Sequence, residues 1–149
     1  MKTCNVKIVL DYDELTEAFP GYTFPFSLKH KIKDIRKECG VKHVTDEIVS
    51  EFIRDHQLSS ITILTDKANE NARVYKMRIS RGDNRGKSNG YRVILLLITC
   101  MGTAFVLDIT DHKKGEDDLT DEQKQFCNKL CDDIDKEIKK ENKGEAKDD

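Results

Sequence analysis

The chain has 149 residues, of which 37% are hydrophobic and 36% charged, and its formal net charge is −2 at pH 7. This length fits one domain with a core of its own. The longest apolar run, Val93–Ile98, is too short to span a membrane. Lys2, Asn5 and Lys7 interrupt the segment Met1–Leu10, so we expect no apolar run of signal-peptide length there. Five cysteines without a CxxC pair argue against a disulfide framework or a zinc site, and we expect a cytoplasmic protein.

The first quarter of the chain combines a strand, a loop and a helix. Asn5–Leu10 is predicted as a strand, and Asp11–Leu15 as the turn that leaves it. Phe19–Phe26 contains both prolines and four aromatic residues, so we predict an ordered loop clamped by aromatic packing, with a peptide-docking groove as the alternative. Apolar residues at helical spacing predict a helix over Leu28–Glu38 with a basic outer face, capped by Gly40.

The middle of the chain adds one more helix and a strand. Thr45 has the character of an N-cap and precedes two acidic residues, so a helix is predicted over Asp46–His56. Ser60–Thr65 is predicted as a strand, and the polar Asp66–Ala72 as a turn.

The C-terminal half contains the most apolar segment. Val93–Cys100 is apolar on both faces, which is typical of a central strand, and a hairpin turn over Met101–Thr103 leads to another strand, Ala104–Thr110. Thr120 and Gln123 have capping-box spacing and open a helix to about Lys140. We therefore predict one domain over residues 1–140, a frayed charged tail over 141–149, and an α+β fold with a curved antiparallel sheet packed against helices.

Two cysteines of the last helix, Cys127 and Cys131, are one helical turn apart. Such spacing can bring two thiols together, but small apolar residues on a packed helix face are the interpretation that we favour.

The segment Val74–Val93 concentrates positive charge. Seven basic residues and one acid lie between Arg73 and Arg92, in a chain that is slightly acidic as a whole. Lys76 and Arg78 alternate with apolar residues of a predicted strand, so they share its polar face. A Gly- and Asn-rich loop then leads to a strand that starts at Tyr91, and antiparallel pairing would bring Arg92 close to Lys76 and Arg78. This pattern predicts a phosphate-binding face, with an exposed basic face that binds nothing in particular as the alternative.

The cations of this segment also suggest phosphate binding and proton transfer. Guanidinium groups bind phosphate oxygens in a bidentate way, and neighbouring cations lower one another's pKa. A lysine with a lowered pKa can accept a proton near neutral pH, while arginines stabilise negative charge in a transition state. Gly82–Ser88 resembles a nucleotide-binding P-loop, but it is one residue too short and precedes a strand where a P-loop needs a helix.

The motifs YKMR, GKSNGYRVILLL and FVLDITDHKKGEDDLTDEQ follow one another within Arg73–Asp133. In this order and spacing they resemble the RelE/HigB-like toxins of bacterial toxin–antitoxin modules. The resemblance implies a RelE-like α+β fold and a metal-independent endoribonuclease that cuts mRNA on the ribosome and so inhibits translation. In that chemistry the 2′-hydroxyl of the substrate attacks the adjacent phosphate. The implied partners are ribosome-bound mRNA and a cognate antitoxin, with no membrane and no small-molecule cofactor.

The resemblance also assigns roles to residues. Lys76 is expected to accept a proton or stabilise charge, and the groups expected to hold the phosphate are Arg78, Arg92 and Lys114. His112 is a candidate acid for the leaving oxygen, although a histidine in a charged loop is often only solvated. The remaining cations expected to bind RNA phosphates are Arg73, Arg81, Arg85, Lys87 and Lys113.

One departure from the family concerns proton transfer. Many relatives have a catalytic tyrosine in the C-terminal helix, and Thr120–Ile138 has none. Two alternatives to an active interferase follow: a non-catalytic RelE-like module that binds RNA or a partner, and a structural protein derived from a mobile element that shares only the fold.

Overall fold

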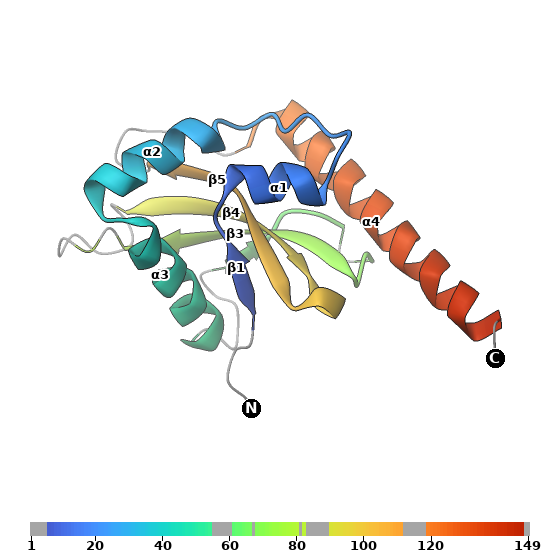
Figure 1. The fold of residues 1–149 in the computed structure, drawn as a ribbon. Helices are drawn as coiled ribbons and strands as arrows, with labels where there is room; N and C mark the ends of the chain where they lie inside the picture. Colours follow the sequence, from blue (N-terminus) through green and yellow to red (C-terminus); the bar gives the residue numbers. More distant parts are fainter. Residues whose placement is uncertain are drawn as a thin grey trace.

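The computed structural model describes residues 6–54, 61–66, 68–80, 82, 90–111 and 119–147, with residues 54 and 143–147 described by their backbone alone. Its described elements are four α-helices and a five-stranded sheet, which makes the fold α+β (Figure 1). No helix among the described residues is both long enough and apolar enough to cross a membrane.

The sheet has the strand order β1-β5-β4-β3-β2. Its strands are β1 (Lys7–Val9), β2 (Ile61–Ile63), β3 (Ala72–Ile79), β4 (Tyr91–Ile98) and β5 (Thr103–Asp111). The pairs β2–β3, β3–β4 and β4–β5 are antiparallel, whereas β1 pairs parallel to β5. The sheet, predicted to be antiparallel, is therefore mixed. Helices connect β1 to the rest of the sheet, so no hairpin turn sets its direction.

β4 is the central strand, as its apolar sequence predicts. All its residues are buried except the half-buried Leu97. The hairpin to β5 passes through a 3₁₀ turn over Thr99–Met101 and Gly102, whose φ of 58° is left-handed. The predicted turn at this place is confirmed.

The helix α1 (Tyr12–Ala18) occupies the segment predicted as a turn. The side chain of Asp11 accepts a hydrogen bond from the Glu14 backbone N–H at 2.9 Å and caps the helix, and Leu15 is buried. With seven residues, α1 is too short to show a clear helical period in the sequence.

The loop after α1 is ordered by aromatic contacts, as predicted. The ring of Phe126 lies 5.2 Å from Phe24, 6.2 Å from Phe26 and 6.3 Å from Tyr22, between ring centroids. The Tyr22 hydroxyl also donates a hydrogen bond to Asp133 at 2.7 Å. The aromatic groups of the loop therefore pack on the last helix of the same chain.

The helix α2 has the predicted bounds, Leu28–Glu38, and Gly40 follows it with a left-handed φ of 88°. The next helix, α3 (Val41–Arg54), begins four residues before the predicted N-cap. Thr45 lies inside it and its hydroxyl donates to the Lys42 carbonyl at 3.0 Å, so it is not a cap.

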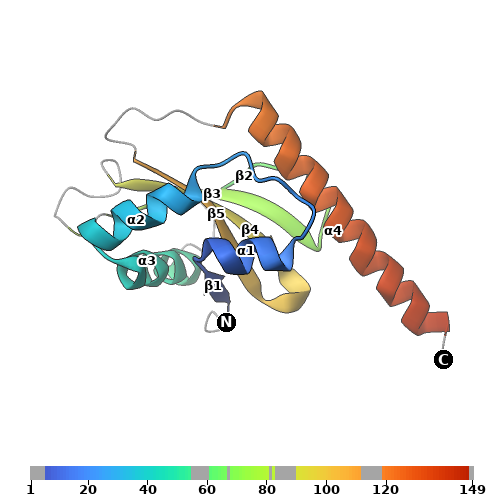
Figure 2. The same cartoon turned by 45° about the horizontal axis from the view of Figure 1, so that its top comes forward.

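The helix α4 (Asp121–Lys147) continues past its predicted end at about Lys140. Its capping box is formed as predicted: the Gln123 N–H donates to the Thr120 hydroxyl at 3.1 Å, and the Thr120 N–H to the Gln123 side chain at 3.0 Å. Figures 1 and 2 both show α4 running along one side of the sheet, with its C-terminal part projecting away from the molecule.

Candidate functional site

The strand β3 has the two faces that its sequence predicts. Tyr75, Met77 and Ile79 are buried on one face, while on the other Lys76 is half-buried and Arg78 is exposed. The side chains of Lys76 and Arg78 therefore belong to the same face of the sheet.

The register of the β3–β4 pair brings the predicted cations together. Arg78 lies directly opposite Arg92, and Lys76 lies opposite Ile94. Directly opposed residues have Cβ atoms about 5 Å apart, and residues two positions apart along a strand are separated by about 7 Å. Lys76, Arg78 and Arg92 thus form one cluster, which we call the cation face.

The two arginines of the cation face differ in exposure. Arg78 is open to solvent, whereas Arg92 is only 6% exposed. Arg92 belongs to the central strand, where β3 and β5 flank it on both sides. A ligand on this face meets Arg78 directly, and Arg92 acts chiefly through a charge set in surroundings of low dielectric constant.

The strand β5 adds an acid that sequence analysis did not place in the site. Asp108 lies opposite Ile94, in the row that also contains Lys76, and it is 6% exposed. A buried carboxylate beside cations orients them and partly offsets their mutual repulsion. The signal for it in the sequence is a single acid within the apolar run Ala104–Thr110.

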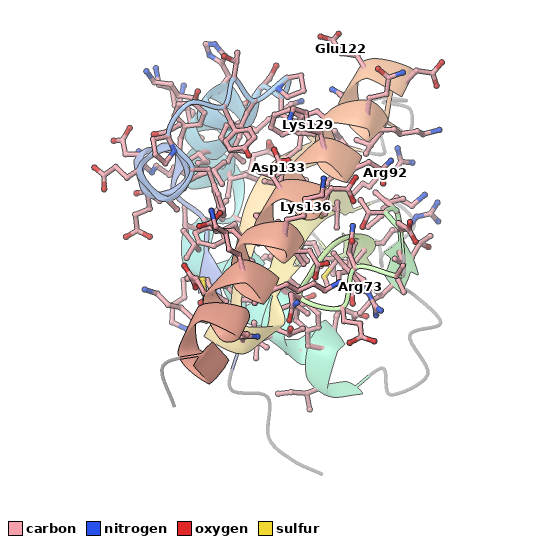
Figure 3. All side chains as sticks on the ribbon, turned by 90° about the vertical axis from the view of Figure 1, so that its right-hand side faces the viewer. Arg73, Arg92, Glu122, Lys129, Asp133 and Lys136 are labelled. Atoms are coloured by element: carbon pink, nitrogen blue, oxygen red, sulfur yellow. The ribbon has the colours of Figure 1, made fainter. Side chains whose placement is uncertain are left out.

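Arg73 does not join the cation face. It lies opposite Leu97, five residues along β3 from Arg78, and its odd number places it on the other face of the strand. Its Nε donates a hydrogen bond to the Asn69 carbonyl at 3.0 Å, and Figure 3 shows Arg73 well separated from Arg92. In the structure this arginine has a role in the turn before β3.

Six of the predicted site residues lie outside the described residues. They are Arg81, Arg85, Lys87, His112, Lys113 and Lys114. The described residues that lead to them, Ile79, Tyr91 and Asp111, are neighbours in register at one end of the sheet. The chain thus leaves the described sheet beside the pair Arg78 and Arg92.

The start of β4 depends on Gly90. A Cβ atom at this position would lie 1.9 Å from the carbonyl oxygen of Ile79, far inside contact distance. The end of β3 is fixed by α3, because the Nε2 of His43 donates to the Ser80 carbonyl at 2.9 Å. These two close approaches set the position of the strand ends that carry Arg78 and Arg92.

Tyr91 lies next to Arg92 but faces the other way. Its hydroxyl donates to Glu38 of α2 at 2.8 Å, and burial together with this bond raises the pKa of the phenol far above its ordinary value. The phenol therefore stays protonated and holds β4 to α2. Because it lies on the opposite face from the cations, it does not replace the tyrosine that the C-terminal helix lacks.

The thiols of Cys127 and Cys131 are both buried in α4, and burial raises the pKa of each to about 12. A protonated thiol is a poor nucleophile and a poor metal ligand, so the packing interpretation fits them. Among the described residues, no three His, Cys, Asp or Glu side chains gather in a group that can hold a metal ion.

Comparisons with models of protein families, with curated proteins and with solved structures find no match for this chain. The function is therefore inferred from the cation face and from the motifs of the sequence.

Proposed function

We propose that this chain is the toxin of a toxin–antitoxin module, an mRNA interferase that cleaves ribosome-bound mRNA with its cation face. The observation that carries the proposal is the direct pairing of Arg78 with Arg92, with Lys76 one pair further along the same face. Three cations clustered on one face favour RNA backbone as the ligand.

The proposed reaction uses a nucleophile that the substrate supplies. The 2′-hydroxyl attacks the adjacent phosphorus, and the bond to the 5′-oxygen breaks, so the products are a 2′,3′-cyclic phosphate and a 5′-hydroxyl end. Arg78 contacts the phosphate oxygens, and the charges of Arg92 and Lys76 stabilise the additional negative charge of the transition state. Lys76 also accepts the proton of the 2′-hydroxyl in this proposal, and His112 or Lys114 protonates the leaving oxygen.

The proposal includes two partners and a location. An antitoxin would cover the cation face, since the same charges that attract RNA attract acidic side chains. The toxin would act in the cytoplasm, where mRNA is translated. The α+β fold, with a five-stranded mixed sheet and helices beside it, agrees with the resemblance at the level of fold class.

A second candidate is a non-catalytic RelE-like module that binds RNA or a partner. Two observations favour it: α4 has no tyrosine among its residues, and Arg92 is nearly buried. Such a module would retain the electrostatic attraction of the cation face but would lack the proton transfers.

Expression of the protein without an antitoxin tests the proposal. We expect growth arrest with the wild type and relief of the arrest with Lys76→Ala or Arg78→Ala, because each change removes a charge from the cation face. Lys124→Ala, which removes an exposed charge from α4, is the control and should arrest growth like the wild type. Arrest that persists in both cation-face variants would contradict the assignment of the site.

A further inference from the structure

A polar pocket apart from the cation face lies between the start of α1 and α2. Its volume is about 160 Å³. The N-cap Asp11 and the first residues of α1, Tyr12 and Asp13, form one wall, and α2 provides a row of side chains that includes Lys29 and Lys33. Figures 1 and 2 show α1 and α2 on the same side of the molecule. None of these residues belongs to the cation face.

The α2 wall of this pocket is a row of hydrogen-bond donors. Lys29, Lys33 and Arg36 are spaced four and three residues apart, so they lie on one face of the helix, and all three are exposed. Within the described part of the chain, these side chains form no ion pair with a carboxylate. Three cations on one wall are a site for an anionic group that accepts hydrogen bonds.

The α1 wall carries acceptors instead. Asp11 and Asp13 are exposed, and Asp11 already accepts one hydrogen bond, from the backbone N–H of Glu14. Each ionised carboxylate has about four lone-pair directions, so both retain acceptor capacity toward the pocket. The half-buried Tyr12 and the buried Ile32 complete the lining. A simple anion would be repelled by this wall, whereas a ligand with hydroxyl groups next to its anionic group suits both walls.

A sugar phosphate has this combination of groups. Its phosphate oxygens accept hydrogen bonds from lysine and arginine, and its hydroxyls donate to carboxylates, as ribose hydroxyls do in many nucleotide sites. A volume of 160 Å³ is below the range of about 300–1,000 Å³ typical for drug-sized ligands, so one sugar–phosphate unit is a better match than a whole nucleotide with its base.

We propose that the pocket between α1 and α2 binds a ribose phosphate unit. We take the source of that unit to be an RNA chain, and this part of the inference rests on the proposed function. The pocket would then give RNA a second contact, remote from the cation face. A carboxylate that accepts from the 2′-hydroxyl makes this contact selective for RNA over DNA. A free ribose phosphate has the same chemistry and is the other source.

Nuclear magnetic resonance titration of the full chain with ribose 5-phosphate tests the site. We expect shifts of the backbone amide signals of residues 11–13 and 29–36, and about tenfold weaker binding of 2-deoxyribose 5-phosphate, which lacks one hydroxyl donor to a charged acceptor. Shifts that are confined to β3 and β4, or equal binding of the two sugars, would overturn the proposal.

Variants separate the two walls of the pocket. Lys33→Gln combined with Arg36→Gln should weaken ribose 5-phosphate binding about tenfold or more, while Lys37→Gln, an exposed residue of α2 outside the pocket, should leave it unchanged. Asp13→Ala should bring the ratio of ribose to deoxyribose affinities toward one. Unchanged binding in the double variant, or an unchanged ratio in Asp13→Ala, would contradict the site.

An oligonucleotide arm identifies the source of the ligand. If a single-stranded RNA displaces ribose 5-phosphate and the matching DNA does not, an RNA chain is supported as the ligand. If the RNA does not displace it, an RNA chain is contradicted as the ligand and a free sugar phosphate is the ligand of the pocket. Arg78→Ala should leave the ribose 5-phosphate-induced shifts of residues 11–13 and 29–36 unchanged, because Arg78 does not line this pocket. Wild-type protein that binds ribose 5-phosphate in the pocket but does not cleave mRNA would contradict the proposed function alone. Protein that cleaves mRNA but does not bind ribose 5-phosphate would contradict the pocket alone.

Discussion

Of the two arginines of the cation face, one meets solvent and the other is enclosed. Arg78 is exposed on β3, and Arg92, directly opposite, has 6% of its surface exposed. The sequence predicts that both reach the same face, because alternation and pairing follow from local pattern. It does not predict the burial of Arg92, which depends on β5 and on the rest of the chain around the central strand.

The difference in burial predicts different costs for the two alanine variants. Arg92→Ala should lower the free energy of unfolding by about 2 kcal/mol, because it removes a buried side chain that packs in the central strand, whereas Arg78→Ala should change it by less than about 0.5 kcal/mol. Urea denaturation followed by circular dichroism measures both values. Equal effects of the two changes would contradict the division into an exposed and an enclosed arginine.

Gly90 offers a test of how the strand ends are positioned. Gly90→Ala places a Cβ atom 1.9 Å from the Ile79 carbonyl oxygen, so the backbone must move, and we expect a loss of about 2 kcal/mol or more in unfolding free energy. Gly40→Ala is the matched control: nothing lies within 4 Å of its Cβ position, and only the left-handed φ of 88° opposes the change, at about 1 kcal/mol. Thermal denaturation that ranks Gly40→Ala as the more harmful change would refute this account of Gly90.

At the scale of elements, α4 is held to the sheet and to the aromatic loop by carboxylates. Asp132 accepts from the Asn69 side chain at 2.5 Å, and the buried Asp135 accepts from the Asn71 side chain at 2.8 Å. Between these two residues in the sequence, Asp133 accepts from Tyr22 and pairs with Lys129 at 3.2 Å. Figure 3 shows Lys129, Asp133 and Lys136 along the same helix.

These contacts predict an acid-sensitive attachment of α4. The hydrogen bond from Tyr22 and the neighbouring Lys129 lower the pKa of Asp133. The pKa of Asp135 is also lowered: burial opposes this, but the bonds from Lys139 and Asn71 outweigh it. A carboxyl with a lowered pKa in the folded state contributes stability above its ordinary value of 3.8, and that contribution is lost as the pH falls through the folded-state pKa.

The unfolding free energy should therefore decrease between pH 5 and pH 2, and the double variant Asp133→Asn with Asp135→Asn should show a shallower decrease. Denaturation curves across this range measure the slope. Asp121→Asn, an exposed acid at the start of the same helix, is the control and should leave the slope close to that of the wild type. Parallel slopes for the double variant and the wild type would contradict the attachment.

The helices also show which helix bounds can be predicted from the local sequence pattern. The bounds of α2 are predicted correctly, because its apolar spacing and the glycine after it act within one element. The start of α3 is predicted wrongly, since Thr45 has the chemistry of a cap but α3 begins at Val41, soon after α2 ends. α1 is missed because seven residues between a strand and a proline-containing loop show no clear period.

At the scale of the whole molecule, the sheet joins the two ends of the described chain. β1 pairs parallel to β5, about a hundred residues later in the sequence, and Tyr22 reaches Asp133 of α4. Pairing over such a separation is not encoded in any local pattern, which is why the mixed sheet is not predicted. The central position of β4 is predicted, because a strand that is apolar on both faces needs cover on both sides.

The same topology gives the molecule two separate polar surfaces. The cation face lies on the strand pair β3–β4, and the pocket between α1 and α2 lies on the helices that cover the sheet. The chain as a whole carries a formal charge of −2, so under the proposed function the approach of RNA would depend on how the cations are concentrated rather than on net charge.

Cleavage of ribosome-bound mRNA, mapped by primer extension with purified wild-type protein and Lys76→Ala, is the most direct test of the proposed activity. We predict cuts in the presence of the wild type, with 5′-hydroxyl ends on the downstream fragments, and at least a tenfold lower rate with Lys76→Ala, since transition-state charge loses one of its stabilising cations. Lys124→Ala should cleave like the wild type. No cleavage by the wild type, or equal cleavage by wild type and Lys76→Ala, would contradict the central claim that the cation face cuts RNA.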